Sequence, residues 1–129
     1  MNPSDIVSKA KNIEAWIIEK RRIIHRQPEL MYEEFETSKL VQKTLYDLNI
    51  KYEKDIAITG VVGTIGNGNA PCIALRADMD ALPIHEETDI EFRSEIDGKM
   101  HACGHDCHTA MLLGACLLYT SPSPRDVEE

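Results

Sequence analysis

The sequence predicts an α/β fold made of two helices, a β-hairpin, a strand, a ligand-rich loop and a last helix. Three observations lead to this expectation. Apolar residues recur at helical spacing in the first part of the chain, the period changes to that of strands after residue 56, and helix formers return after residue 105. A length of 129 residues with 43% hydrophobic and 28% charged residues is typical of one globular domain.

The first helix is expected to begin near Ser4 or Asp5, since either side chain can cap a helix N-terminus. Its apolar stripe consists of Ile6, Ala10, Ile13, Ile17 and Ile24. The helix should end before Pro28, because the residue before a proline avoids the α conformation. A second helix is predicted to end at Asn49. Its apolar face consists of Val41, Leu45 and Leu48.

Strands are expected after Ile56. The segment 58–65 is rich in Val, Ile and Thr, and the sequence Gly-Asn-Gly-Asn at 66–69 is a strong turn signal. Residues 72–75 should therefore form the second strand of a hairpin. Residues 84–100 are predicted to be an irregular polar connection, and His105 or Asp106 should open the last helix.

The end of the chain, residues 116–129, is expected to be a disordered tail that is not native to the protein. Pro122 and Pro124 interrupt helix formation there. Residues 116–126 also match the translation of a transposase adapter used in sequencing libraries. The domain is therefore expected to cover residues 1–115, and the natural sequence to stop at about Ala115.

Composition limits the possible partners. The net charge is −8, and the one basic run, Lys20-Arg21-Arg22, is interpreted as a solvated helix face, so nucleic acid is not expected as a partner. No apolar run approaches the roughly 20 residues that span a bilayer, and the first residues lack the features of a secretory signal. Three of the four cysteines lie in or near one donor cluster. This argues against a disulfide framework and favours a cytoplasmic location.

The segment 101–108 places six potential metal ligands in eight residues. They are His101, Cys103, His105, Asp106, Cys107 and His108. Imidazole, thiolate and carboxylate groups together suit zinc, manganese, cobalt or nickel. Cys103 and His105 would point to the same side of an extended segment, with Gly104 between them allowing close approach. Asp80, which follows the predicted strand, could orient a ligand histidine through a hydrogen bond.

Other interpretations of these residues stay open at this point. Cys103 could be an inert cysteine beside a capping histidine, and Asp78 and Asp80 could serve only as turn residues before Pro83. A structural zinc site would need a second pair of ligands, which the sequence lacks. A cysteine nucleophile activated by a histidine is a further alternative, although no oxyanion-hole motif is recognisable.

Four motifs occur in a familiar order: RIIHRQPELMYEE at 22–34, TGVVG at 59–63, RADMDALP at 76–83 and MHACGHDCHTAM at 100–111. Together they resemble the metal-dependent amidohydrolases that include hippurate hydrolase, N-acyl-amino-acid hydrolases, auxin-conjugate hydrolases and N-acetyldiaminopimelate deacetylase. The resemblance implies the N-terminal part of a zinc-peptidase-like catalytic domain, without the lid or dimerisation domain of the family.

The resemblance also implies a chemistry. Two divalent metal ions (Zn, Mn, Co or Ni) would activate a water that hydrolyses the amide bond of a small N-acyl amino acid. Cys103 and His105 match metal ligands of the family, and Asp80 matches the acid that supports the catalytic site. Asp78 stands where distant relatives carry a histidine ligand, and Cys107 stands where many relatives have glycine.

Several family features have no counterpart in this sequence. The glutamate pair that supplies the general base and a further ligand is absent, as are two ligand histidines. The chain alone is therefore expected to be inactive, although the full-length parent would be an enzyme and could be a homo-oligomer. Because the family sheet includes later strands, residues 1–115 alone are expected to expose unpaired edges and to aggregate.

Overall fold

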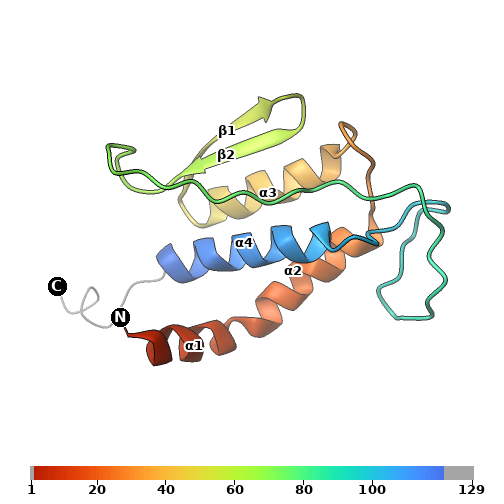
Figure 1. Cartoon of the computed structure of the whole chain (residues 1–129), viewed down its shortest axis with the longest axis horizontal. Coiled ribbons are helices and arrows are strands. Elements are labelled where there is room, and N and C mark those ends of the chain that lie inside the picture. Colours follow the sequence, from red (N-terminus) through yellow and green to blue (C-terminus); the bar gives the residue numbers. More distant parts are fainter. Residues whose placement is uncertain (1, 121–129) are drawn as a thin grey trace.

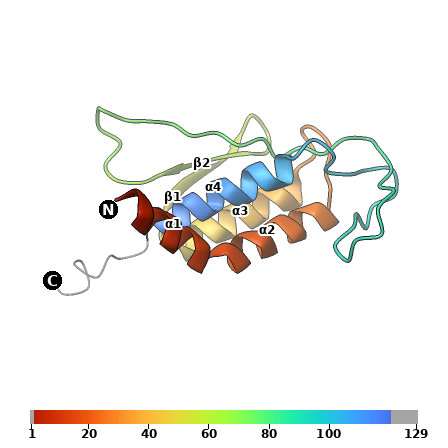
Figure 2. The same cartoon turned by 60° about the horizontal axis from the view of Figure 1, so that its bottom comes forward.

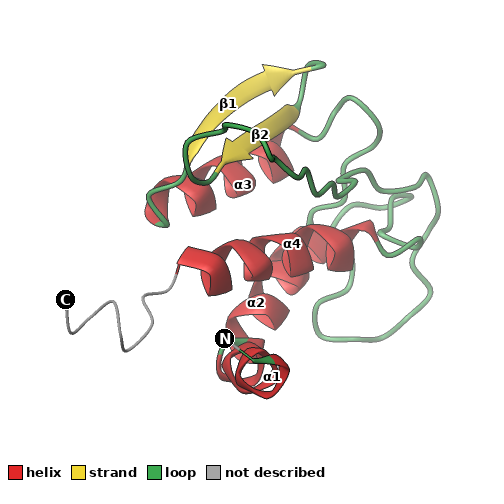
Figure 3. Ribbon diagram, turned by 60° about the vertical axis from the view of Figure 1, so that its left-hand side comes forward, coloured by secondary structure: helices red, strands yellow, loops and turns green. Residues whose placement is uncertain are grey.

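The structure, a computed structural model, describes residues 2–120. Its elements are α1 (Pro3–Asn12), α2 (Glu14–Arg26), α3 (Phe35–Asp47), β1 (Lys51–Ile56), β2 (Gly60–Thr64) and α4 (His105–Thr120). They are stacked in layers, with the hairpin over α3, α4 beneath α3, and α2 packed against α4 (Figure 1 and Figure 3). A long connection without regular strands joins β2 to α4 and brings the candidate site to one end of the helices (Figure 2).

The first predicted helix is two helices in the structure. Asn2 caps α1, accepting a 3.0 Å hydrogen bond from the Asp5 amide, and Pro3 occupies the first turn, where a missing N–H costs nothing. The Ile13 amide then bonds to the Ala10 carbonyl at 3.2 Å, three residues back. This tighter turn ends α1 and starts α2 in a new direction. As predicted, α2 ends before Pro28.

The N-terminus of α3 is capped from outside the helix. The Glu29 carboxylate accepts hydrogen bonds from the amides of Glu36 and Thr37, at 2.9 and 2.7 Å, and from the Thr37 hydroxyl at 2.6 Å. A carboxylate at this end also suits the positive end of the helix dipole. At the other end Asn49 takes a left-handed φ of 59°, as expected for the residue that terminates this helix.

The predicted hairpin is wrong in its pairing. β1 and β2 are antiparallel, with Lys51 opposite Thr64 and Ile56 opposite Gly60, so residues 57–59 form the turn. The charged residues of Lys51–Ile56, three of them consecutive at 53–55, concealed this strand, because most of its side chains face solvent and it shows no alternation of polar and apolar residues. Gly66 and Gly68 do have positive φ, but the turn there leads into an extended segment rather than a second strand.

That extended segment, residues 72–75, is not a strand of any sheet among residues 2–120. Ile73 is 88% and Leu75 72% exposed. Strand propensity alone does not make a strand, because a strand forms only where a neighbour pairs with it. The later connection is irregular, as predicted, and is tied by one bridge in which Leu82 and Met100 exchange hydrogen bonds of 2.9 and 3.0 Å.

α4 begins at His105, as predicted, but continues beyond Ala115 to Thr120. The expectation of a disordered tail is therefore wrong for residues 116–120, which carry helix formers and precede the first proline. Residues 121–129 lie outside the described part of the chain. The buried face of α4 includes Ala110 and Leu113, and Gly114 lies directly against Ile17 of α2. None of the helices in residues 2–120 is long and apolar enough to cross a membrane.

Candidate metal centre

The structure brings Asp80 and His105 together. Nδ1 of His105 lies 2.9 Å from both the Oδ1 atom and the backbone oxygen of Asp80. Both partners are acceptors, so Nδ1 donates its proton and Nε2 of a neutral ring carries the lone pair. This is the arrangement by which a carboxylate fixes the tautomer of a metal-binding histidine.

Asp78 also lies near His105. Its Oδ2 atom is 3.5 Å from the Nε2 atom of His105, and its Oδ1 atom pairs with Arg76. The Thr109 hydroxyl of α4 donates a 2.8 Å hydrogen bond to the Asp78 carbonyl oxygen. The acids of the segment 76–83 are therefore held against the first turns of α4, although they lie 25 or more residues away in sequence.

Cys103 is not part of this arrangement. Its thiol is exposed, and Gly104 has a φ of 103°, so the extended geometry expected for Cys103 and His105 is not present. The reason is that α4 starts at His105, with the His108 amide bonding to the Gly104 carbonyl at 3.0 Å. Within residues 2–120, no three His, Cys, Asp or Glu side chains are arranged to hold a metal ion.

The chemical types of these donor groups nevertheless suit a metal ion. The Nε2 atom of His105, a thiol on the same loop and the carboxylate of Asp78 are the groups that borderline-soft divalent metals bind. A site completed by donors from elsewhere could use His105 without any change to its hydrogen bond with Asp80. Residues 2–120 thus carry donor groups of the kind that a metal site uses, although by themselves they form no such site.

The other donors of the segment 101–108 have different surroundings. The ring of His108 lies 5.6 Å from that of His105, measured between centroids. His101 is buried, and burial lowers its pKa to about 4, so its ring is neutral at pH 7. Neither ring nitrogen of His101 has a hydrogen-bond partner among the described residues. Asp106 points into the interior and is 1% exposed.

Asp106 belongs to a buried network that the sequence analysis missed. Its Oδ2 atom accepts hydrogen bonds from Nδ1 of His25 at 2.8 Å and from Nε of Arg21 at 2.7 Å. Nε2 of His25 lies 2.9 Å from the Oε1 atom of Glu86. The interpretation of the basic run at 20–22 as a solvated face is therefore wrong for Arg21. The sequence does carry one indication of this buried network: His25 lies next to Ile24, which belongs to the apolar stripe.

The network should make the protein sensitive to acid. Burial alone would raise the pKa of Glu86, but hydrogen bonds from Thr88 and Ser94 and the charge of His25 hold that pKa below its ordinary 4.5. Below about 4.5 the unfolded chain therefore binds a proton that the folded chain does not. Glu86 contributes stability that is present above this pH and is lost as the pH falls through its lower folded-state pKa.

We expect the urea midpoint to fall between pH 5 and pH 3, and to fall less steeply in Glu86→Gln. Exposed Glu36, which pairs with Lys39, offers the matched control Glu36→Gln. If the urea midpoint of both variants fell with pH as steeply as that of the unmodified protein, Glu86 would not be the source of the acid sensitivity.

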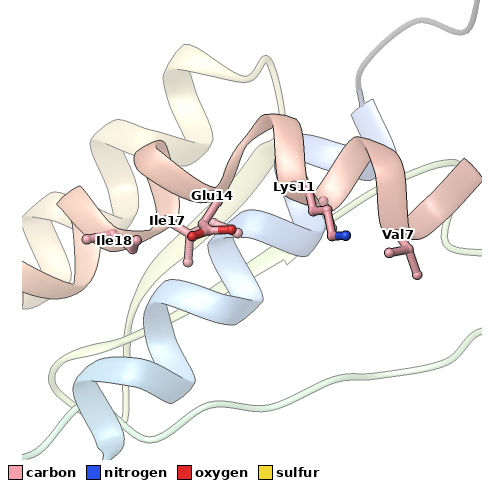
Figure 4. A pocket seen from close by; sticks show the side chains of 6 residues that line it. Val7, Lys11, Glu14, Ile17 and Ile18 are labelled. Atoms are coloured by element: carbon pink, nitrogen blue, oxygen red, sulfur yellow. The ribbon is translucent and has the colours of Figure 1, made fainter.

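A shallow, mostly apolar hollow on α1 and α2 lies outside the candidate metal centre (Figure 4). Its lining residues are Val7, Ala10, Lys11, Glu14, Ile17 and Ile18. None of the predicted site residues contributes to it.

Comparison with known proteins confirms the resemblance found in the motifs. Residues 74–121 match the sequence model of a family described as Peptidase family M20/M25/M40. The chain is 54% identical over 118 residues to the IAA-amino acid hydrolase ILR1-like 5 of Arabidopsis thaliana, covering 90% of this chain and 27% of that protein. It is 55% identical over 120 residues to thermostable carboxypeptidase 2 of Saccharolobus solfataricus, covering 88% of this chain and 30% of that protein.

The fold is also similar to a solved structure. The YXEP protein of Bacillus subtilis, described as a dinuclear metal binding peptidase from the M20 family, superposes with a TM-score of 0.79 at 42% identity. The match covers 92% of this chain and 33% of that protein. The chain therefore spans about a third or less of the length of the proteins it matches. Its fold is similar to that of one part of this solved peptidase.

Proposed function

Because this chain is similar over most of its length to hydrolases of the M20 peptidase family, we propose that it is the N-terminal part of an amidohydrolase. The reaction would cleave the amide bond of an N-acyl amino acid to a carboxylic acid and an amino acid. Hippurate-like, N-acetyl-amino-acid and auxin-conjugate-like compounds are the substrate classes. The proposal rests chiefly on the hydrogen bond from His105 to Asp80, which leaves the Nε2 atom of His105 available to a metal.

In this proposal His105 and Cys103 hold metal, and Asp80 supports the catalytic site by fixing the His105 ring. Two divalent metal ions, when bound, polarise the amide carbonyl and lower the pKa of a bound water. The relative described as dinuclear supports the number of ions. Cys103, whose thiol is exposed and not in a disulfide, would have to turn toward His105 to bind the same metal ion.

The general base is proposed to come from outside residues 2–120. One glutamate of each Glu-Glu pair, at 33–34 and 86–87, is already engaged. Glu34 is 8% exposed and accepts a 3.0 Å hydrogen bond from the Thr59 hydroxyl, and Glu86 is bonded to His25. The chain alone is then a partial metal-binding module without turnover. The longer protein would carry the activity.

The location is proposed to be cytoplasmic. All four cysteines are free, which suits a reducing compartment. The small N-acyl amino acid is the proposed partner. Whether the longer protein forms a homo-oligomer is a separate measurement, for example by light scattering.

The test compares the 129-residue chain with the longer gene product that contains it. Both are assayed with Mn²⁺ or Zn²⁺ on N-acetyl amino acids and on hippurate. We expect turnover only by the longer protein, and a fall of about 10- to 100-fold in kcat/KM or metal affinity in Asp80→Ala. Asp47→Ala, at an exposed ion pair with Lys43, is the control and should change neither quantity.

Two results would contradict the proposal. Turnover by the 129-residue chain would show that its own residues include a base. No turnover by the longer protein on a broad panel of acyl amino acids would remove the proposed reaction, even if metal still bound.

A further inference from the structure

His25 of α2 lies between two carboxylates in the interior. Its Nδ1 atom is 2.8 Å from the Oδ2 atom of Asp106, and its Nε2 atom is 2.9 Å from the Oε1 atom of Glu86. The three side chains are 1%, 1% and 2% exposed. They come from α2, from the first turn of α4 and from the irregular connection, so this contact joins three separate parts of the chain.

The ring of His25 is held on both sides. Each ring nitrogen lies within hydrogen-bond distance of a carboxylate oxygen, 2.8 Å from Asp106 and 2.9 Å from Glu86. Glu86 is itself fixed by a 2.8 Å hydrogen bond from the Ser94 amide. Rotation of the His25 ring would therefore break a buried contact on each side. The edge of the His25 ring also packs against Phe92, with 5.5 Å between ring centroids.

The carboxylate of Asp106 connects the His25 ring to the candidate metal centre. One oxygen accepts from His25 and Arg21, and the other accepts a 2.9 Å hydrogen bond from the Cys107 amide. Both oxygens are therefore committed, and the first turn of α4 cannot rotate about the helix axis without breaking a buried ion pair. The neighbouring residue on that turn is His105, whose ring reaches Asp80.

We infer that His25 is a positioning residue: through its buried hydrogen bond it holds Asp106, fixes the first turn of α4 and so sets the direction of the His105 ring. The consequence for metal affinity rests on the proposed function. The direction of the His105 ring does not, because it can be measured without metal.

The test uses the ¹⁵N-labelled 129-residue chain. In the unmodified protein, NMR at pH 7 should show a hydrogen-bonded proton on Nδ1 of His105. In His25→Gln that His105 proton signal should disappear or move. Cobalt affinity, followed through the absorption of the cobalt–thiolate bond, should fall about 10- to 100-fold.

Leu45→Ala is the matched control. Leu45 is a buried residue of α3, so the variant loses stability without touching the network, and it should keep the His105 signal and the cobalt affinity. If His25→Gln does not fold, as judged by circular dichroism, Glu86→Gln replaces it. This variant keeps the shape of the site but removes one of the two charges, and it should move the His105 signal in the same direction.

The outcomes separate this inference from the proposed function. An unchanged His105 signal in the folded variant would overturn the positioning role even if cobalt binds. If the unmodified chain binds no cobalt while the His105 signal still depends on His25, the inference holds and the proposed metal site fails.

Discussion

Replacing Asp106 with alanine is expected to lower the free energy of unfolding by about 3–5 kcal/mol, because a buried charge pair is broken and one partner is left behind. The His25 ring, which is 1% exposed, would lose its partner on one side, and Arg21 would lose its ion pair. Since small domains are stable by only about 5–15 kcal/mol, such a loss would leave much of the protein unfolded under mild conditions. Urea denaturation followed by circular dichroism at pH 7 measures it.

Asp47→Ala provides the comparison for this measurement. Asp47 pairs with Lys43 on the surface of α3, where both side chains are more than half exposed. Exposed pairs of this kind contribute at most about 1 kcal/mol. Equal losses in the two variants would mean that Asp106 contributes no more than a surface charge.

A valine at position 114 is expected to cost about 1–3 kcal/mol through overpacking between α2 and α4. A Cβ atom on Gly114 would lie 2.6 and 2.7 Å from two side-chain carbons of Ile17, which is closer than carbon atoms approach in folded proteins. The helices would have to separate or Ile17 would have to leave its position. The thermal midpoint of the variant, compared with that of the unmodified protein, measures the loss.

The neighbouring exposed residue Ala115 supplies the control, since Ala115→Val adds the same β-branched side chain without facing α2. Shortening the opposing residue, Ile17, should restore part of the loss. The double variant Gly114→Val with Ile17→Ala is therefore expected to lose less stability than the two single variants lose when their losses are added. If the stability losses of the two substitutions were strictly additive, the close approach of α2 and α4 would not be what restricts the size of the side chain at position 114.

The helices were largely predictable because their signals are local. Pro28 sets the end of α2, and Asn49 takes the backbone conformation that ends α3. The break at Ile13 was not predictable in the same way, because the apolar stripe continues across it while the backbone tightens for one turn. Helix α4 continues past Ala115 because residues such as Leu118 favour helix and the first proline after Ala115 is Pro122.

The strands were harder to predict because pairing depends on residues far away in the chain. The segment 72–75 has the composition of a strand yet remains exposed, whereas Lys51–Ile56 is rich in charges and pairs with β2. The site shows the same contrast. The contact of Asp80 with His105 followed from chemistry recognisable in the motifs. The pairing of His25 with Glu86 joins residues 61 positions apart and could not be predicted from the sequence around either residue.

The bridge between Leu82 and Met100 closes residues 83–99 into a loop whose ends stay fixed whatever its length. The entropy lost on closing a loop grows only with the logarithm of its length, by about 0.6 kcal/mol for each doubling. At the exposed Gly98, with a φ of 78°, nothing lies within 4 Å of an added Cβ position. An insertion at Gly98, close to the bridge at the base of this loop, should therefore cost little free energy. Between Glu86 and Ser94, which are joined by a 2.8 Å hydrogen bond, an added residue would displace a buried charge.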